Sequence, residues 1–280
     1  MTEWYEINRQ TRAVDPADRG FQYGDGLFET IAVRDGEPRQ WQYHLDRLTA
    51  GCERLGLELP TRSLELDLGV ALARSRQDKS FCIAKIVITA GSSVRGYGRA
   101  LPTPGDVYIG IFPSTPLNKP AYLKGVATML CETRLATGSP VAGIKTLNRI
   151  EQVLASSECQ PTGAFEGFTL DAADRLICGT ISNLFIVKDK LIRTPSLERC
   201  GVAGTMRRLV MGLLARDDCD VEVCDLTEKD LADADEVFIT NSQIGAVPVH
   251  RCGNYKWDIG PQTRRVMRLL ADHGIEECRV

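Results

Sequence analysis

The sequence predicts a mixed α+β protein that is divided into two domains. Segments with strand and helix periodicity alternate along the 280 residues without the regular strand–helix–strand repeat of a doubly wound parallel sheet. One segment, Pro113–Pro120, interrupts every regular pattern because it holds three prolines among polar residues. We therefore expect a smaller α/β domain at 1–113, an interdomain linker at 114–120 and a larger domain at 121–280.

The composition narrows the class of protein. Hydrophobic residues make up 43% of the chain and charged residues 25%, as in soluble globular proteins. The net charge of −3 and the lack of a basic run argue against nucleic-acid binding. Met1–Glu6 carries acidic residues and no apolar segment of a secretory signal, and no apolar run is long enough to span a membrane. We expect a cytoplasmic protein with a small-molecule substrate.

In the first domain, a turn at Tyr23–Gly26 is followed by a strand, and leucines spaced three and four residues apart mark a helix that ends at Gly56. A polar residue at Ser63 is suited to cap a second helix. The predicted elements are, in order, a strand at 28–33, a helix at about 45–55, a helix at 63–76, and strands at 81–90 and 107–112.

In the second domain, Thr227–Asp230 resembles a capping box, and Gly260–Pro261 precedes a final helix that ends at Gly274. The other elements follow from short apolar runs and from helical spacing. Strands are predicted at about 125–131, 164–170, 183–188, 236–241 and 246–250, and further helices at about 147–158, 205–216 and 227–233.

The ten cysteines are scattered, with no C-x-x-C pair. We expect most of them to be small, reduced core residues rather than disulfide partners. The three histidines, His44, His250 and His273, are too far apart in sequence for a local metal motif, so we expect no metal site.

Lys145 is the first candidate for chemistry. It lies in a short loop directly before a helical pattern, in which Ile150, Val153 and Leu154 share one apolar face. A lysine that packed neighbours hold in place and desolvate can lose its proton and bond covalently to a carbonyl group. Without other evidence, however, a loop lysine is usually a solvated surface charge.

Several segments could bind a phosphate. Gly201–Arg207 brings glycines, and the hydroxyl of Thr205, to the start of a helix, where backbone N–H groups and the helix dipole favour an anion. Arg47 on the first helix and Asn241 at a strand end could add donors. Each has a structural alternative: Thr205 as an N-cap, Arg47 as a solvated charge, and Asn241 in an Asx turn. One lysine with phosphate-type sites suits a pyridoxal-phosphate enzyme.

Taken together, these segments resemble the class IV, D-amino-acid-aminotransferase-like family of pyridoxal 5'-phosphate enzymes, whose fold is called fold type IV. The resemblance implies that Lys145 bonds to the cofactor, while Arg47, the amides of Gly204 and Thr205, and the Asn241 side chain hold its phosphate. It also implies a homodimer with the active site at the domain interface, near the neighbouring subunit. The matching pieces are, in chain order, Asp18–Thr30, His44–Leu48, Gly143–Asn148, Ser182–Phe185, Gly201–Arg207 and Thr240–Asn241.

Within this family, Lys145–Gln152 and Arg95–Tyr97 are similar to the aminodeoxychorismate lyases. That likeness implies conversion of 4-amino-4-deoxychorismate to 4-aminobenzoate and pyruvate, for folate biosynthesis or a specialised pathway. Lys145 would act as general base, with Thr30 as a hydroxyl helper, and Arg95, with Tyr97, would bind the substrate. The alternatives are an aminotransferase for D- or branched-chain amino acids and a degenerate cofactor-binding protein without activity.

One position departs from the family pattern. Relatives have a glutamate five residues before the asparagine that corresponds to Asn183, where it pairs with the protonated pyridine nitrogen of the cofactor; here that residue is Cys178. A thiol is a weak hydrogen-bonding group and cannot replace a carboxylate as counter-ion. Either another acid folds into this place, or the cofactor ring lacks an acidic partner.

Overall fold

The computed structural model describes residues 3–6, 14–59 and 61–280. The chain forms two compact units. Unit 1 comprises the chain up to Thr115 together with Ile144–Asn148, and unit 2 comprises Pro116–Gly143 and Arg149–Val280. Each unit is described by itself.

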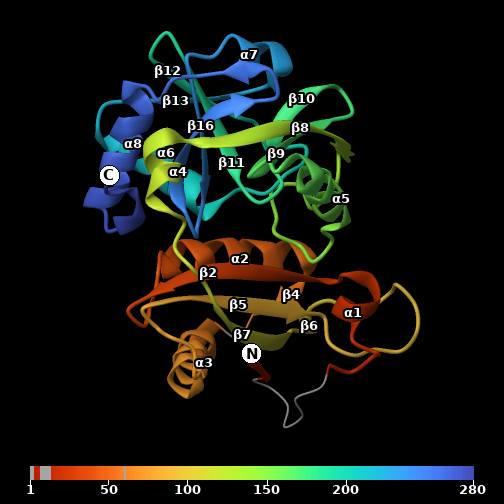
Figure 1. Cartoon of the computed structure of the whole chain (residues 1–280). Coiled ribbons are helices and arrows are strands. Elements are labelled where there is room, and N and C mark those ends of the chain that lie inside the picture. The colour runs from red at the N-terminus through yellow and green to blue at the C-terminus, as the bar shows by residue number, and fades with distance from the viewer. Residues whose placement is uncertain (1–2, 7–13, 60) are drawn as a thin grey trace. The chain divides into compact units, whose positions relative to one another are not determined.

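Unit 1 is built on an antiparallel sheet with the strand order β1-β7-β5-β2-β3 (Figure 1). Helix α2 packs along β2, and α3 packs against β7. A separate pair of two-residue strands, β4 and β6, runs parallel. The strands are β1 (Glu3–Glu6), β2 (Gly26–Arg34), β3 (Glu37–Pro38), β4 (Leu57–Glu58), β5 (Phe81–Thr89), β6 (Thr103–Pro104) and β7 (Asp106–Pro113), and the helices are α1 (Arg19–Tyr23), α2 (Trp41–Leu55) and α3 (Thr61–Arg74).

Strand β5 shows why this sheet has two different faces. Its even-numbered residues from Cys82 to Ile88 are fully buried, whereas the odd-numbered ones from Phe81 to Val87 are half-buried, as the two-residue period of a strand requires. Cross-strand partners lie on the same face, so Phe28 and Thr30 of β2 share the half-buried face with their partners Val87 and Lys85.

The fully buried face of β2 carries an ionic network. The carboxylate of Glu29, which is 1% exposed, accepts hydrogen bonds from Arg47 Nε at 2.7 Å and Arg47 Nη2 at 2.5 Å, and its Oε2 lies 2.7 Å from His44 Nδ1. Burial acts to raise the pKa of Glu29. The charge of Arg47 and the hydrogen bonds of His44 and Arg47 outweigh burial and hold this pKa at about 2. Glu29 therefore stays ionised inside unit 1.

The segment Ile144–Asn148 belongs to unit 1 because its backbone pairs with the start of β2. Phe28 N donates to Lys145 O at 3.0 Å, and Leu147 N donates to Gly26 O at 3.0 Å. This corrects the sequence-based division, which placed residues 121–280 together in the second domain. The expected linker at 114–120 also differs, because the structure divides the chain between Thr115 and Pro116, and α4 begins at Lys119.

Unit 2 contains a mixed sheet with the strand order β13-β12-β11-β15-β16-β8-β9-β10-β14, and β17 pairs with β16 (Figure 1). Pairs β12–β13, β16–β8 and β8–β9 are parallel and the others antiparallel. The strands are β8 (Val126–Leu135), β9 (Glu166–Asp171), β10 (Arg175–Gly179), β11 (Asn183–Lys188), β12 (Leu191–Pro195), β13 (Val221–Cys224), β14 (Leu226–Thr227), β15 (Glu236–Asn241), β16 (Gly245–Cys252) and β17 (Tyr255–Lys256).

The helices of unit 2 cover this sheet and bury its aromatic core. Helix α5 packs on β8 and β9, α6 on β15, and α8 on β15 and β16. Phe185 of β11 and Phe238 of β15 stack with their ring centroids 4.8 Å apart, and both are fully buried. The α-helices are α4 (Lys119–Lys124), α5 (Ile150–Cys159), α6 (Thr205–Arg216), α7 (Glu228–Ala232) and α8 (Pro261–Asp272).

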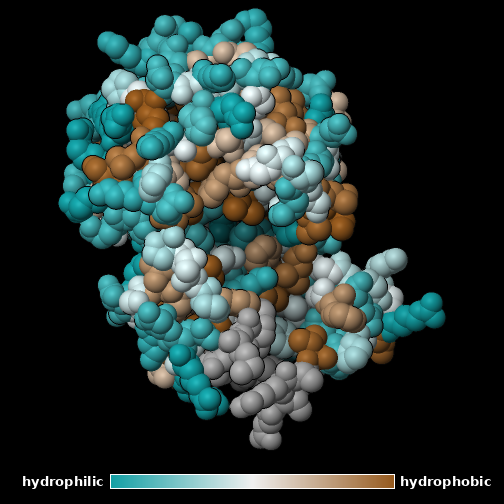
Figure 2. Space-filling model, in the orientation of Figure 1, coloured by the Kyte–Doolittle hydropathy of each residue, from teal (hydrophilic) through white to brown (hydrophobic). Residues whose placement is uncertain are grey.

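The predicted helix at 205–216 and the strands at 183–188 and 236–241 are confirmed, as is the capping box at Thr227. The prediction missed the short helices α1 and α4 and the strands β1, β3, β4, β6, β10, β12, β13, β14 and β17. Ile150, Val153 and Leu154 of α5 are exposed in this chain, and Figure 2 shows hydrophobic atoms at the surface over this helix. The buried side of α5 is formed by Ala155 and Cys159 instead, so the apolar stripe does not mark the packed face.

All ten cysteines are free thiols, and eight of them are buried, as expected for reduced core residues. Within the described ranges, no helix has both the length and the apolar character needed to cross a membrane.

The Glu29 network predicts a pH dependence of stability. Because the folded-state pKa is depressed from its ordinary value near 4.5 to about 2, the ionised carboxylate contributes stability above pH 4.5, and this contribution disappears as the pH falls towards 2. Glu29→Gln should lower the free energy of unfolding by ~3 kcal/mol at neutral pH. Urea denaturation should show this difference from the wild type shrinking between pH 4.5 and 2.

The exposed Glu37 provides the matched control, since Glu37→Gln should have little effect at any pH. A Glu29→Gln deficit that stays constant across the acid range would show that ionisation of Glu29 does not stabilise the fold.

Candidate active site

Lys145 is held by its backbone and by its neighbours. Ile144 and Thr146 on either side are buried, and the backbone of Lys145 is fixed along β2. The side chain is half-buried, and its Nζ lies 4.2 Å from the centroid of the Phe28 ring. Lys145 is therefore not an ordinary solvated lysine, because it lies in a fixed segment with its amine against an aromatic face.

The glycine-rich segment before α6 is fastened to the residues that precede Lys145. Gly143 N donates to Gly201 O at 3.0 Å, and Ala203 N donates to Gly143 O at 2.9 Å. Gly143 has φ +79°, a left-handed conformation that favours glycine. Asn183 Nδ2 adds a hydrogen bond to Val202 O at 2.9 Å. The loop at 201–203 is thus fixed by backbone and side-chain hydrogen bonds together.

The N-terminus of α6 has the features of an anion site. Gly204 is the N-cap, in an extended conformation, and no described side chain caps the helix. A Cβ at this position would lie 1.9 Å from Asn183 Oδ1, so a larger residue would displace the asparagine. Thr205 is the first helical residue and is buried, which corrects the alternative that it acts as N-cap. The first-turn N–H groups and the helix dipole suit a phosphate.

Arg47, the third predicted phosphate donor, lies on α2 in unit 1. Its guanidinium engages Glu29 through Nε and Nη2, so the alternative of a solvated surface charge is wrong. Glu29 fixes the orientation of the guanidinium, which can still interact with an anion because it presents several N–H groups. Its assignment to a cofactor phosphate stays a prediction.

The side chain of Asn241 closes the turn after β15. Its Oδ1 accepts hydrogen bonds from Gln243 N at 2.8 Å and Ile244 N at 3.0 Å, and its Nδ2 donates to Ile181 O at 3.4 Å. These contacts match the Asx-turn alternative. They do not support the expected role of this amide as a phosphate donor, which stays a prediction.

Cys178 lies on β10, 6% exposed, in an apolar cluster with Leu135, Ile177, Leu197 and Cys200. Thr169 Oγ1 lies 3.7 Å from its sulfur. Burial raises the pKa of the Cys178 thiol to about 12. At neutral pH this residue is an uncharged thiol and cannot act as a carboxylate-like counter-ion.

Glu166 is the buried acid next to the Cys178 segment, and the sequence-based reasoning did not single it out. Its carboxylate accepts hydrogen bonds from the backbone N–H groups of Gly167, Thr180 and Ile181 and from the hydroxyls of Thr180 and Ser182. These donors occupy both oxygens, so Glu166 stabilises the turn between β10 and β11. Such a fully engaged carboxylate is a weak candidate for the missing acid.

The predicted substrate residues Arg95 and Tyr97 lie in an exposed loop of unit 1. Tyr97 is 86% exposed, and its ring packs edge-on against Tyr23 at a centroid distance of 5.3 Å. The buried Arg19 fixes the loop by donating to Gly96 O at 2.9 Å and Tyr97 O at 2.6 Å. The hydrogen bonds from Arg19 thus hold the backbone of the loop, while the side chains of Arg95 and Tyr97 remain exposed.

Thr30 lies on the half-buried face of the unit 1 sheet, directly opposite Lys85 of β5. The ammonium of Lys85 lies 5.0 Å from the centroid of the Phe28 ring, which Lys145 also contacts. The sequence-based reasoning did not single out Lys85 as a site residue, because the segment Phe81–Ala90 that contains it was interpreted only as an apolar strand. The available signal was a single charged residue, Lys85, within the otherwise largely apolar run Phe81–Ala90.

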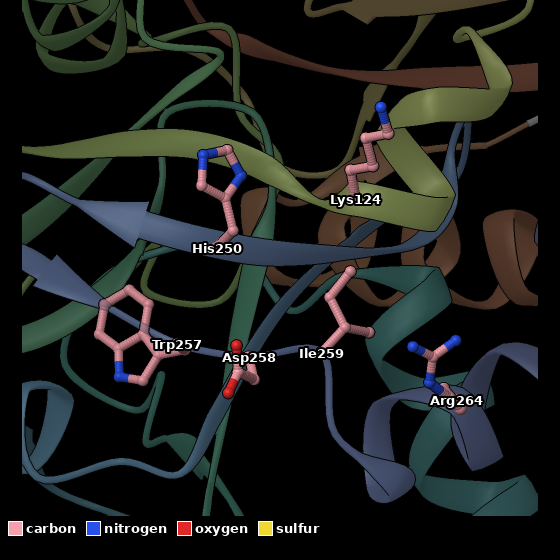
Figure 3. Close-up of a pocket in the computed structure, with 6 residues that line it drawn as sticks. All are labelled: Lys124, His250, Trp257, Asp258, Ile259 and Arg264. Atoms are coloured by element: carbon pink, nitrogen blue, oxygen red, sulfur yellow. The ribbon is translucent and has the colours of Figure 1, made fainter.

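A hollow of about 570 Å³ lies in unit 2, and Figure 3 shows the side chains that line it. None of the predicted site residues lines it. Its charged side chains are exposed and of both signs, which gives no defined ligand chemistry. The lining residues are Lys124, His250, Trp257, Asp258, Ile259 and Arg264.

Comparison with known proteins identifies the family of this chain. The family model for amino-transferase class IV matches residues 26–252. The aminodeoxychorismate lyase of Vibrio harveyi is 38% identical over 90% of this chain and 94% of that protein. A D-alanine aminotransferase of Listeria monocytogenes is 26% identical over 97% of this chain and 94% of that protein.

Solved structures show the same fold. The 4-amino-4-deoxychorismate lyase of Pseudomonas aeruginosa has a TM-score of 0.88 and 36% identity, over 98% of this chain and all of that one. The branched-chain aminotransferase of Escherichia coli has a TM-score of 0.82 at 23% identity, over 95% and 91% of the two chains, which shows the fold alone. The chain belongs to the class IV aminotransferase family and has its type IV fold.

Proposed function

We propose that this chain is a pyridoxal-phosphate-dependent lyase that converts 4-amino-4-deoxychorismate to 4-aminobenzoate and pyruvate. The observation that carries the proposal is the 38% identity to the Vibrio harveyi lyase over nearly the whole of both chains. The aminotransferase relatives reported above are less similar, at 26% and 23% identity. By the same resemblance, we propose that the enzyme is a cytoplasmic homodimer.

At two of the three anchor points of the cofactor, the residues present have the chemistry that it requires, which supports the proposal. Lys145 offers an amine in a fixed segment, and the uncapped N-terminus of α6 offers N–H groups for a phosphate, which Arg47 would supplement. The third point, the pyridine nitrogen, would meet the neutral thiol of Cys178. When bound, the cofactor supplies an electron-withdrawing group that weakens a neighbouring C–H bond of the substrate amine.

Lys145 would carry the proton transfers. Its Nζ takes the proton from the ring carbon that bears the substrate amine, and the bond between the ring and the enolpyruvyl oxygen breaks with its electron pair on oxygen. Lys145 can then return the proton to the leaving enolpyruvate, which becomes pyruvate as the ring becomes aromatic. Thr30 lies on the sheet face that also bears Phe28, and its hydroxyl is a candidate to assist. Arg95 and Tyr97 would bind substrate from their accessible loop.

The thiol at position 178 favours elimination over transamination. An aminotransferase needs a protonated pyridine ring to stabilise negative charge, whereas aromatisation supplies its own driving force to the lyase reaction. The aminotransferase alternative predicts that amino acids alone convert the cofactor to its amino form. The degenerate alternative predicts no turnover, although the ordered phosphate and lysine segments argue against it.

Lys145→Ala should abolish lyase activity and the visible absorption of the bound cofactor. The purified wild-type protein should be yellow and should retain the cofactor by mass spectrometry after borohydride reduction, because the amine of Lys145 forms the covalent bond. The exposed Lys119 provides a control, and Lys119→Ala should retain both properties. A visible band that survives Lys145→Ala unchanged would rule out this lysine, and a colourless wild type reconstituted with cofactor would rule out the cofactor.

Cys178→Glu should raise transamination relative to elimination by about tenfold, since a carboxylate would stabilise the protonated pyridine ring. The measurement is the ratio of amino-form cofactor to released pyruvate during turnover of aminodeoxychorismate. Cys178→Gln, a neutral side chain of the same size as glutamate, controls for altered packing. An equal ratio in the wild type and both variants would remove the link between Cys178 and reaction choice.

A further inference from the structure

Two thiols of unit 2, those of Cys131 and Cys159, lie close together. Cys131 is on β8, and Cys159 is the last residue of α5, which packs against that strand. Both thiols donate hydrogen bonds to the same carbonyl oxygen, that of Ala155, at 3.5 Å and 3.6 Å. The two cysteines and Ala155 form one buried cluster. Two segments that are separate in sequence thus bring a pair of sulfur atoms together.

Gly167 of β9 provides the space for this pair. A Cβ at this position would lie 2.4 Å from Cys131 Sγ and 2.7 Å from Cys159 Sγ, so the two sulfurs are no more than about 5 Å apart. Glycine weakens the interior of a strand and often marks the close approach of another group. The φ of Gly167 is not in the left-handed region, so its backbone conformation does not require glycine. The room that the two sulfurs need accounts for this residue instead.

The surroundings keep both thiols protonated at neutral pH. Both are free thiols, and burial raises the pKa of each. The negative charges of Glu158 on α5 and Glu166 on β9 raise both pKa values further. Because the thiolate is the reactive form, the pair reacts slowly. Cys159 is followed directly by the exposed residues 160–163, so it is the thiol with the shorter route to a dissolved oxidant.

We propose that Cys131 and Cys159 are a thiol–disulfide site, which hydrogen peroxide oxidises to a disulfide between β8 and the end of α5. The Cys159 thiolate attacks a peroxide oxygen, which gives a sulfenic acid and releases hydroxide. The Cys131 thiol then attacks the Cys159 sulfur and loses its proton, and water leaves as the S–S bond forms. Overall, the two thiols lose two electrons and two protons, and the peroxide is reduced to two waters.

The disulfide would join the two ends of the chain segment that carries Lys145. Between Cys131 and Cys159, the chain leaves unit 2 after Gly143, pairs with β2 and re-enters unit 2 at Arg149. A covalent bond between the ends of this segment restricts the unfolded chain and so stabilises the folded one. In a reducing compartment such a bond is transient, so it would form during exposure to the oxidant and be reduced afterwards. This inference does not depend on the proposed lyase function.

The test treats the full-length, cofactor-loaded protein with hydrogen peroxide and alkylates the remaining thiols after unfolding. Mass spectrometry should find a cross-linked peptide pair that contains Cys131 and Cys159, lighter by two hydrogens, and two fewer alkylated cysteines. The cross-link should form about tenfold faster at pH 8 than at pH 7, because the thiolate fraction rises with pH below the thiol pKa. The Tm should rise by about 5 °C and return to its first value after reduction with dithiothreitol.

Four variants separate this pair from a general effect of oxidation. Cys131→Ala should give neither the cross-link nor the rise in Tm, whereas Cys252→Ala, at a buried cysteine of β16, should give both. Gly167→Ala keeps both cysteines but places a methyl group between their sulfurs, so the cross-link should form at least about tenfold more slowly. Gly212→Ala on α6 is its control, because a Cβ there meets no neighbouring atom within 4 Å, and it should cross-link as the wild type does.

Several results would overturn the proposal. Peroxide might leave all ten thiols intact, join other cysteines, or carry Cys159 to the sulfinic acid without a cross-link. A cross-link that forms as fast in Gly167→Ala as in the wild type would also overturn it, because the close approach of the two sulfurs would then not control the reaction. None of these measurements uses turnover, so a failure of the lyase assignment would leave them unchanged.

Discussion

The reciprocal backbone hydrogen bonds between Gly143 and the 201–203 loop are the constraint on which the candidate site depends. They fix the loop that leads into α6, and they do so two residues before Lys145 in the chain. Gly143 can make both bonds because its positive φ is accessible to glycine without strain. Asn183 reinforces the same loop from β11. Rigid supports of this kind hold reactive groups more accurately than a mobile loop could, since the geometry is set before any ligand arrives.

Two half-buried cations of the unit 1 sheet and its helix, Arg47 and Lys85, have different surroundings. Arg47 has an acidic partner, because Glu29 fixes its guanidinium and remains ionised through that pairing. Lys85 has an aromatic ring beside it in the described structure. A permanently charged, oriented guanidinium suits a phosphate that stays bound, whereas the half-buried ammonium of Lys85 lies against the face of the Phe28 ring.

The sequence predicted what depends on local pattern and missed what depends on tertiary pairing. The helix at 205–216 and the strands at 183–188 and 236–241 were correct because their apolar spacing and flanking glycines or polar residues are local signals. Lys85 was missed because its proximity to Phe28 and Lys145 arises from the register between β5 and β2. The engagement of Glu166 by the β10–β11 turn, and the burial of Ala155 rather than Ile150 in α5, likewise result from neighbours that are distant in sequence.

The return of Ile144–Asn148 to unit 1 means that the chain passes between the units three times, after Thr115, after Gly143 and after Asn148. Neither unit is therefore a continuous piece of the gene. A fragment that ends at residue 115 would lack the segment that pairs with Gly26–Phe28, leaving that edge of β2 open to association with other chains. Replacing residues 116–280 with a different domain would likewise remove Lys145 from the sheet with which its segment pairs. The segment that carries Lys145 thus makes unit 1 depend on chain that has already passed through unit 2.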